Sequence, residues 1–128
     1  MGLPAAKSGD IVRGMDIHIL LVSPALIPIP TPLPFDGLIG SGLSTNVNIG
    51  GRPAATVGSL AINTVPHFPT IGLFQRPPSN QATILTGSAT VFINGRPAAR
   101  NGDTAMTCND PVDAPMGTVI ATGNVNFG

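Results

Sequence analysis

The sequence predicts an all-β domain of three similar units that close around a pseudo-threefold axis. Gly and Pro account for 16 and 14 of the 128 residues, and almost no stretch of ordinary helix length escapes Gly, Pro or β-branched residues. Short β-branched stretches alternate with turn signals, which is the pattern of an all-β chain. Hydrophobic residues make up 42% and charged residues 9%, so the chain is too apolar to stay disordered. In addition, one short segment of similar sequence occurs three times, and we call it the repeated phrase.

The clearest copy of that phrase spans residues 91–103. Val91 to Ile93 is a β-branched and aromatic stretch, which favours a strand. Asn94-Gly95 follows and is a strong hairpin signal, because both residues tolerate a positive φ. Pro97 has no N–H for a sheet ladder, so the returning strand lies at an edge or begins there. Residues 101–103, Asn-Gly-Asp, predict a second turn.

A second copy spans residues 47–59, and a third is split between the two ends of the chain. Residues 3–10 repeat the second half of the phrase, and residues 125–128 repeat its first half. The corresponding prolines at positions 4, 53 and 97 are 49 and 44 residues apart, a spacing typical of repeat architectures. A unit divided between the termini predicts that the N- and C-terminal segments pair and close the structure.

We therefore expect a single domain over residues 1–128. Its units comprise about residues 125–128 with 1–22, then 44–67, then 87–108. Residues 23–40 form a Pro-rich apolar insertion whose alternating prolines predict an extended, polyproline-like segment that cannot join a central sheet. This insertion is either a strap packed on the domain's own wall or a docking surface for a partner. Residues 63–81 form a second, less apolar excursion.

Three residues are candidate metal ligands. His18 lies 14 residues after Pro4, and His67 lies 14 residues after Pro53. In the third unit, Cys108 follows Pro97 by 11 residues. A threefold fold brings equivalent positions together near its axis, and two imidazoles with a thiolate suit Zn²⁺. The alternative is that each of the three is an ordinary structural residue.

The sequence leaves the fourth ligand position of such a site open. Water can fill it, as can a carboxylate such as Asp16 or Asp110. Three protein ligands with a water is also the pattern of a catalytic zinc. However, the sequence has no second histidine set for acid–base work and no Glu at all. We read the Gly-Asp pairs at residues 9–10 and 102–103 as turn residues, and we do not expect an enzyme.

Composition excludes several other classes. Six basic and six acidic residues cancel, and Trp and Tyr are absent, which argues against a nucleic-acid-binding surface. A single cysteine excludes an intramolecular disulfide framework. The most apolar stretch, residues 17–29, is too short to span a bilayer. The N-terminus has no apolar signal segment, so we expect no export by the general secretory route.

Residues 96–100, Arg-Pro-Ala-Ala-Arg, follow an Asn-Gly turn and precede Gly-Asp. This combination resembles the PAAR-repeat family, and residues 52–56 and 4–7 repeat it with Thr or Lys at the last position. The resemblance implies a small pointed β-pyramid (β-prism) on the tip of the trimeric spike of type VI secretion systems and related contractile injection machines. It also implies one structural zinc near the tip. Its usual ligands are three histidines and one cysteine, whereas this chain offers His18, His67 and Cys108.

By this resemblance, the function is that of a structural tip. The chain would cap and sharpen a trimeric VgrG-like spike, one copy per trimer, and help to puncture the target envelope in transient contact with a membrane. We expect a monomer on its own, made in the bacterial cytoplasm and assembled on the injection particle. The alternative is a small zinc-binding adaptor that links a separate effector or cargo protein to the spike.

Overall fold

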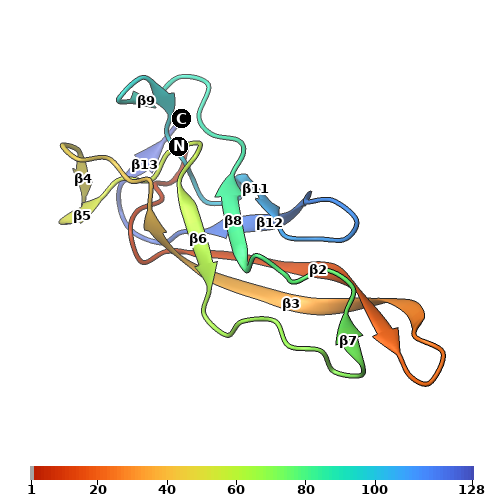
Figure 1. Cartoon of the computed structure of the whole chain (residues 1–128). Coiled ribbons are helices and arrows are strands. Elements are labelled where there is room, and N and C mark those ends of the chain that lie inside the picture. Colours follow the sequence, from red (N-terminus) through yellow and green to blue (C-terminus); the bar gives the residue numbers. More distant parts are fainter. Residues whose placement is uncertain (1) are drawn as a thin grey trace.

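The computed structural model describes residues 2–128, and over that range all regular secondary structure is β (Figure 1). Six strands form a closed antiparallel ring in the order β12-β11-β8-β6-β3-β2, with β2 pairing back to β12. The ring strands are β2 (Ile11–Val22), β3 (Ile27–Ser41), β6 (Leu60–Asn63), β8 (Gln81–Ile84), β11 (Thr104–Thr107) and β12 (Ala114–Ile120). A short β7 (Leu73–Phe74) pairs with the far end of β2. Within residues 2–128 we find no helix with the length and apolarity to cross a membrane.

Three short antiparallel pairs stand apart from the ring and correspond to the three copies of the repeated phrase. They are β1 (Leu3–Pro4) with β13 (Asn126–Phe127), β4 (Asn48–Ile49) with β5 (Arg52–Pro53), and β9 (Phe92–Ile93) with β10 (Arg96–Pro97). Both termini lie in the first pair, where Leu3 is opposite Phe127. The predicted pairing of the N- and C-terminal segments is therefore confirmed, and the all-β pyramid of three repeats is the observed fold.

The three pairs meet in a cyclic set of backbone hydrogen bonds. The N–H of Ala6 donates to the carbonyl of Ala99, that of Ala99 to Ala55, and that of Ala55 to Ala6, each at 3.0 Å. All three alanines are fully buried. We call them the alanine ring. Small side chains are needed here because three backbones approach one axis. The pseudo-threefold axis predicted from the repeats passes through this ring.

The turns that follow the ring also repeat. In the first unit the Asp10 carboxylate accepts the N–H of Lys7 at 3.0 Å. In the third unit Asp103 accepts the N–H of Arg100 at 2.7 Å. The second unit uses the hydroxyl of Ser59 in the same way. The interpretation of the Gly-Asp pairs as turn residues is therefore confirmed.

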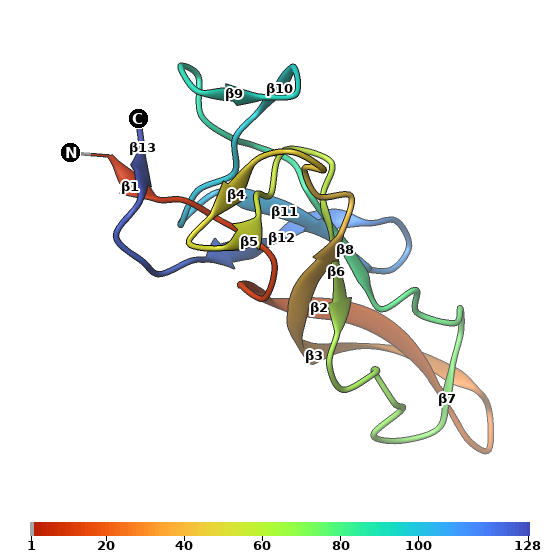
Figure 2. The same ribbon diagram turned by 90° about the vertical axis from the view of Figure 1, so that its left-hand side faces the viewer.

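The molecule tapers from the three short pairs to a single hairpin. Figures 1 and 2 show β1/β13, β4/β5 and β9/β10 spreading at one end, with the β2–β3 hairpin extending from the other. The main core fills the strand ring between these ends and includes Val12, Phe35 and Val119. The ring closes where β2 and β12 pass closely at Gly14 and Gly117. A Cβ on Gly14 would lie only 2.3 Å from the Met116 carbonyl oxygen.

The expectation that the Pro-rich insertion stays out of the sheet is wrong. Most of residues 23–40 belong to β3, which pairs with β2 from Ile27 to Leu38. The prolines are compatible with this pairing because they alternate. Four of them face alternate residues of β2: Pro28, Pro30, Pro32 and Pro34. Their nitrogens lie at the free edge, where no ladder N–H is required. Where β3 pairs with β6, from Gly37 to Ser41, it contains no proline.

Candidate metal centre

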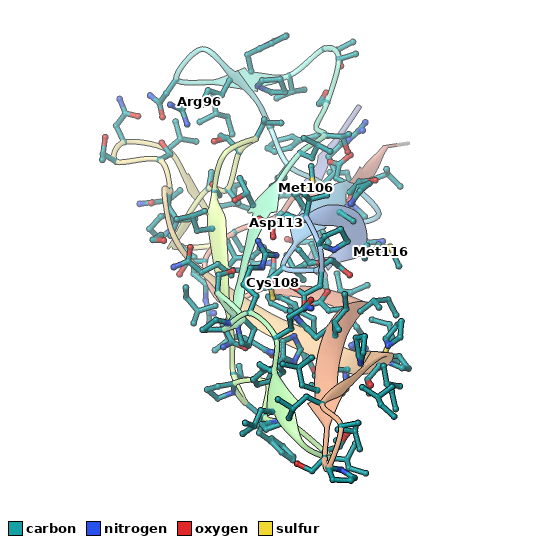
Figure 3. All side chains as sticks on the ribbon, turned by 45° about the vertical axis from the view of Figure 1, so that its right-hand side comes forward. Arg96, Met106, Cys108, Asp113 and Met116 are labelled. Carbon is teal, nitrogen blue, oxygen red and sulfur yellow. The ribbon has the colours of Figure 1, made fainter. Side chains whose placement is uncertain are left out.

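The structure brings the three predicted ligands together with one carboxylate. Asp16, His18, His67 and Cys108 each offer a ligand atom, and these atoms all lie within 4.8 Å of one another. We call this group the four-residue cluster. In Figure 3, Cys108 lies at mid-height, far from Arg96 at the end with the three short pairs. The cluster therefore lies between the alanine ring and the β2–β3 hairpin loop.

Strand periodicity explains how β2 contributes two members. Asp16 and His18 are two residues apart, so both side chains point to the same face of the strand, which is the interior. Their side chains are buried, with 0% and 1% exposure. The other face of β2 carries Ile17 and Ile19, which remain partly exposed. The twelve-residue length of β2 thus extends the interior past the main core to the cluster.

The other two members come from segments next to the ring strands. His67 lies beyond β6, where its backbone N–H donates to the Asn80 side chain at 2.7 Å. Its side chain is only 2% exposed, and its ring packs edge-on against Phe35 at a centroid distance of 6.1 Å. Cys108 directly follows β11 and is 2% exposed. Three separate parts of the chain therefore meet at this point.

Polar atoms in the cluster are incompletely satisfied. Asp16 Oδ2 lies 2.8 Å from His67 Nε2 and accepts from Cys108 Sγ at 3.3 Å. Among residues 2–128, Asp16 Oδ1 and both ring nitrogens of His18 find no hydrogen-bond partner. Buried polar atoms without partners are rare in folded proteins because each costs about 1–3 kcal/mol. A bound cation would satisfy these lone pairs.

Burial also sets the protonation of the cluster. Desolvation lowers the pKa of His18, and the neighbouring His67 adds to this effect. The imidazole of His18 is thus held neutral, which is the form that binds metal. Burial raises the pKa of the Cys108 thiol to about 11, with a further contribution from Asp16. A metal ion at this position would displace the thiol proton.

The donor set fits zinc. Two imidazole nitrogens, one thiolate sulfur and one carboxylate oxygen are all established zinc ligands. Bonds of about 2.0–2.3 Å from a tetrahedral zinc to nitrogen, oxygen and sulfur place the ligand atoms about 3.3–3.8 Å apart. The four atoms here already lie within 4.8 Å of one another, so closing around an ion requires only small side-chain shifts. Of the two carboxylates that the sequence left open as a fourth donor, Asp16 is the one that lies in the cluster.

Asp110, the other carboxylate considered, lies behind the cluster rather than in it. Its Oδ2 is 3.4 Å from His18 Nδ1 and accepts the N–H of Ile19 at 2.8 Å. Its Oδ1 accepts from Arg76 Nε at 3.0 Å. Arg76 also donates to the carbonyl of Asn109. The Asp110 carboxylate thus lies next to His18 without a hydrogen bond to its ring. A small shift of either side chain would let it orient the imidazole from outside a coordination sphere.

Sequence reasoning did not identify the Arg76–Asp110 pair. Arg76 lies in the later part of the excursion of residues 63–81, past His67, where the other units offer no matching residue and therefore no offset to compare. The sequence offered Asp110 only as a possible ligand. Its position behind His18, rather than in the cluster, depends on distances that only the folded structure provides. The same holds for Asn80, whose side chain fixes the backbone of His67.

A sequence-family model described as the PAAR motif matches residues 74–127. This range includes the third copy of the repeated phrase and Cys108, but neither histidine of the cluster. A search of curated proteins found no match to this chain.

Proposed function

We infer that this chain is a PAAR-repeat protein, because its residues 74–127 match the family model described as the PAAR motif, and the members of that family are spike-tip proteins. We propose that it caps the trimeric VgrG-like spike of a contractile injection machine, with one copy per trimer. The end with the three short strand pairs would contact the spike. The tapered end would point away from the spike and meet the target envelope first.

The alanine ring is the observation that carries this proposal. Its three hydrogen bonds are equal in length and cyclic, so one chain presents three similar faces around one axis. A pseudo-threefold surface matches the symmetry of a trimer, and a trimer has only one such end to occupy. The short pairs expose edge strands and apolar side chains, with Phe92 58% and Leu3 41% exposed. Strand edges and apolar side chains suit an end-on contact between β-structures.

We further propose that the ion held by the four-residue cluster is zinc and that its role is structural. When bound, zinc supplies a cross-link among chain segments that a small core holds only weakly. Asp16 and His18 would fix β2, His67 the segment beyond β6, and Cys108 the end of β11. The tapered end would then resist unfolding when it is driven against a target envelope.

Assembly on the particle is part of the same proposal. The chain would be made in the bacterial cytoplasm, join the spike there, and leave with it. A small adaptor that links a separate cargo protein to the spike is the competing function. The two differ in partner, since a cap binds the spike directly and an adaptor requires cargo.

Native mass spectrometry of the chain mixed with a trimeric spike protein tests this proposal. We expect a complex with one chain and three spike subunits. Phe92→Asp, at the wide end, should weaken binding at least tenfold, whereas Leu73→Asp, at the tapered end, should leave it unchanged. Three chains per trimer would contradict a cap, as would binding that survives a bulky fusion on the receiving end of the trimer. Binding only in the presence of cargo would favour the adaptor.

A further inference from the structure

The two segments that form the end of the molecule opposite the alanine ring are apolar and contain no charged side chain. Residues 17–35 and 64–75 contain no Asp, Glu, Lys or Arg. All eight residues from 23 to 30 are exposed, and Ser23 is the only one with a polar side chain. Large apolar side chains on these segments are 43–67% exposed: Leu26, Ile27, Ile29, Val65, Phe68, Ile71 and Leu73. Figures 1 and 2 show that these segments form the narrow end of the molecule. We call this surface the apolar end.

The wide end is built differently. Its exposed apolar side chains, such as Phe92, share their hairpins with charged residues that include Arg52 and Arg96. A mixed surface of this kind suits a contact with another protein, where apolar and polar groups lie side by side. An exposed apolar surface free of charge instead marks a site for a membrane or an apolar partner.

The backbone of the apolar end lacks donors along one edge. On β2, the outward N–H groups of Ile17 and Ile19 donate to the side chains of Asn109 and Asp110. On β3, the corresponding outward positions are occupied by four prolines, Pro28, Pro30, Pro32 and Pro34, which have no N–H. Unsatisfied donors are costly in contact with hydrocarbon. Prolines along the edge also prevent a further strand from adding there, which disfavours a second copy or a β-strand ligand as the occupant.

The loop of the hairpin keeps a large apolar residue at a position that disfavours it. Leu26 has a φ of 52°, the left-handed region in which Gly or Asn is the usual residue. A left-handed conformation is unfavourable for an L-residue with a large side chain. Leu26 is nonetheless half exposed, at 51%, so packing within the chain does not account for its presence.

From these observations we propose that the apolar end inserts into the interfacial region of a lipid bilayer and that acyl chains cover its exposed side chains. The carbonyls of Pro28 and Pro30 still need donors, so the insertion is shallow, at the boundary of headgroups and acyl chains. The absence of charge means that the binding requires no anionic lipid. This inference deepens the proposed function by naming the surface that first meets a target membrane. The inference rests on the proposed spike contact only for the claim that the apolar end faces the membrane.

Single-tryptophan fluorescence tests the proposal on the whole chain, because the sequence contains no Trp. Ile27→Trp reports on the hairpin loop, and Phe92→Trp is the matched control at the wide end. Neutral vesicles of phosphatidylcholine and phosphatidylethanolamine should shift the emission of Ile27→Trp to shorter wavelength. Brominated acyl chains should quench it. Phe92→Trp should show neither effect.

Vesicle flotation with loop variants supplies the second measurement. The unmodified chain should float with vesicles, and the double variant Leu26→Asn, Ile27→Asn should lose at least tenfold of that binding. The variant should keep its thermal stability, since Asn is suited to the conformation of Leu26. No flotation of the unmodified chain, or equal quenching at both tryptophans, would overturn the proposal. An Ile27→Trp signal that responds to a protein partner and never to vesicles would do the same. Neither measurement includes a spike protein. A failure of the proposed spike binding would therefore appear only in the mass spectrometry experiment and not in these membrane assays.

Discussion

The alanine ring and the four-residue cluster occupy the same pseudo-threefold frame but are stabilised in different ways. In the ring, each unit contributes the same residue type and the same backbone hydrogen bond, at 3.0 Å in all three cases. In the cluster, the units contribute unlike side chains, with Asp16 and His18 from the first, His67 from the second and Cys108 from the third. Repetition thus builds the wide end from equivalent backbone hydrogen bonds and buried apolar side chains. The tapered end depends on a few side chains and on what they bind.

This contrast has an energetic consequence. The ring buries small apolar side chains and pairs its own polar groups, so its stability needs no ligand. The cluster buries four polar side chains and leaves three of their atoms without a partner among residues 2–128. Such a site is costly unless an ion fills it. We therefore expect the two ends to respond differently to metal, substitution and pH.

Removal of a cluster ligand should have the largest effect. Cys108→Ser should abolish stoichiometric zinc binding and lower the free energy of unfolding by about 4 kcal/mol or more, as loss of a structural metal does. Elemental analysis of tag-free protein and urea denaturation measure the two effects. Chelation should reduce the unmodified chain to the stability of the variant and leave the variant itself unchanged. If the variant retained one zinc atom per chain, Cys108 would not be a zinc ligand.

Overpacking of the alanine ring should have the next largest effect. Ala99→Val places two methyl groups into a fully buried position where three backbones converge. The expected loss is about 1–3 kcal/mol of unfolding free energy, with zinc still bound at one atom per chain. Ala25→Val, in the exposed hairpin loop, is the matched control and should change stability little. Loss of zinc from Ala99→Val would show that the two ends are coupled.

Asp110 should act on the site through His18. Asp110→Asn removes the carboxylate charge 3.4 Å from His18 Nδ1 and should weaken zinc affinity about 10–100-fold, as loss of an orienting carboxylate does. Competition with a chromogenic chelator measures the affinity. Asp113→Asn is the control, because Asp113 is 58% exposed and its carboxylate lies 4.0 Å from Arg76 Nη2, whereas Asp110 is paired with His18 itself. A fall in affinity of the same size in both variants would point to a general charge effect.

The smallest effect concerns pH in the metal-stripped chain. Burial holds the pKa of His18 below its ordinary value of 6.5, so the unfolded chain binds a proton more readily than the folded chain does. Stability should be constant with respect to this group above pH 6.5. It should fall as the pH drops from 6.5 toward the lower folded pKa. Urea denaturation in chelator across this interval measures the slope. His18→Gln should reduce that slope, and an unchanged slope would assign it to another group.

Much of the wide end was predictable because it depends on repeated residues. The offsets of Pro4, Pro53 and Pro97 predicted three units. The split phrase predicted that the N- and C-terminal segments pair, and Leu3 is observed opposite Phe127. Turn chemistry at Asn94-Gly95 and at the Gly-Asp pairs is local, so a sequence carries it directly. The equal offsets of His18 and His67 likewise indicated a shared location.

The tapered end was harder to predict because its determinants are not local. The prolines of residues 28–34 predict a segment outside the sheet, yet only one edge of β3 is paired there and each proline nitrogen faces the free edge. Sequence alone does not tell which edge of a strand is free. The choice between Asp16 and Asp110 depended on a distance that strand register sets. Arg76 had no repeat partner to reveal it.

Hydrogen exchange with and without metal tests the central contrast most directly. Tag-free protein is loaded with one equivalent of zinc or stripped with chelator, and amide exchange is followed by mass spectrometry. Stripping should speed exchange at residues 15–19, 63–68 and 106–110 and leave residues 5–7, 54–56 and 98–100 protected. That result would show a wide end held by its own backbone and a tapered end held by an ion. A uniform change over the whole chain, or no response to zinc at all, would contradict it.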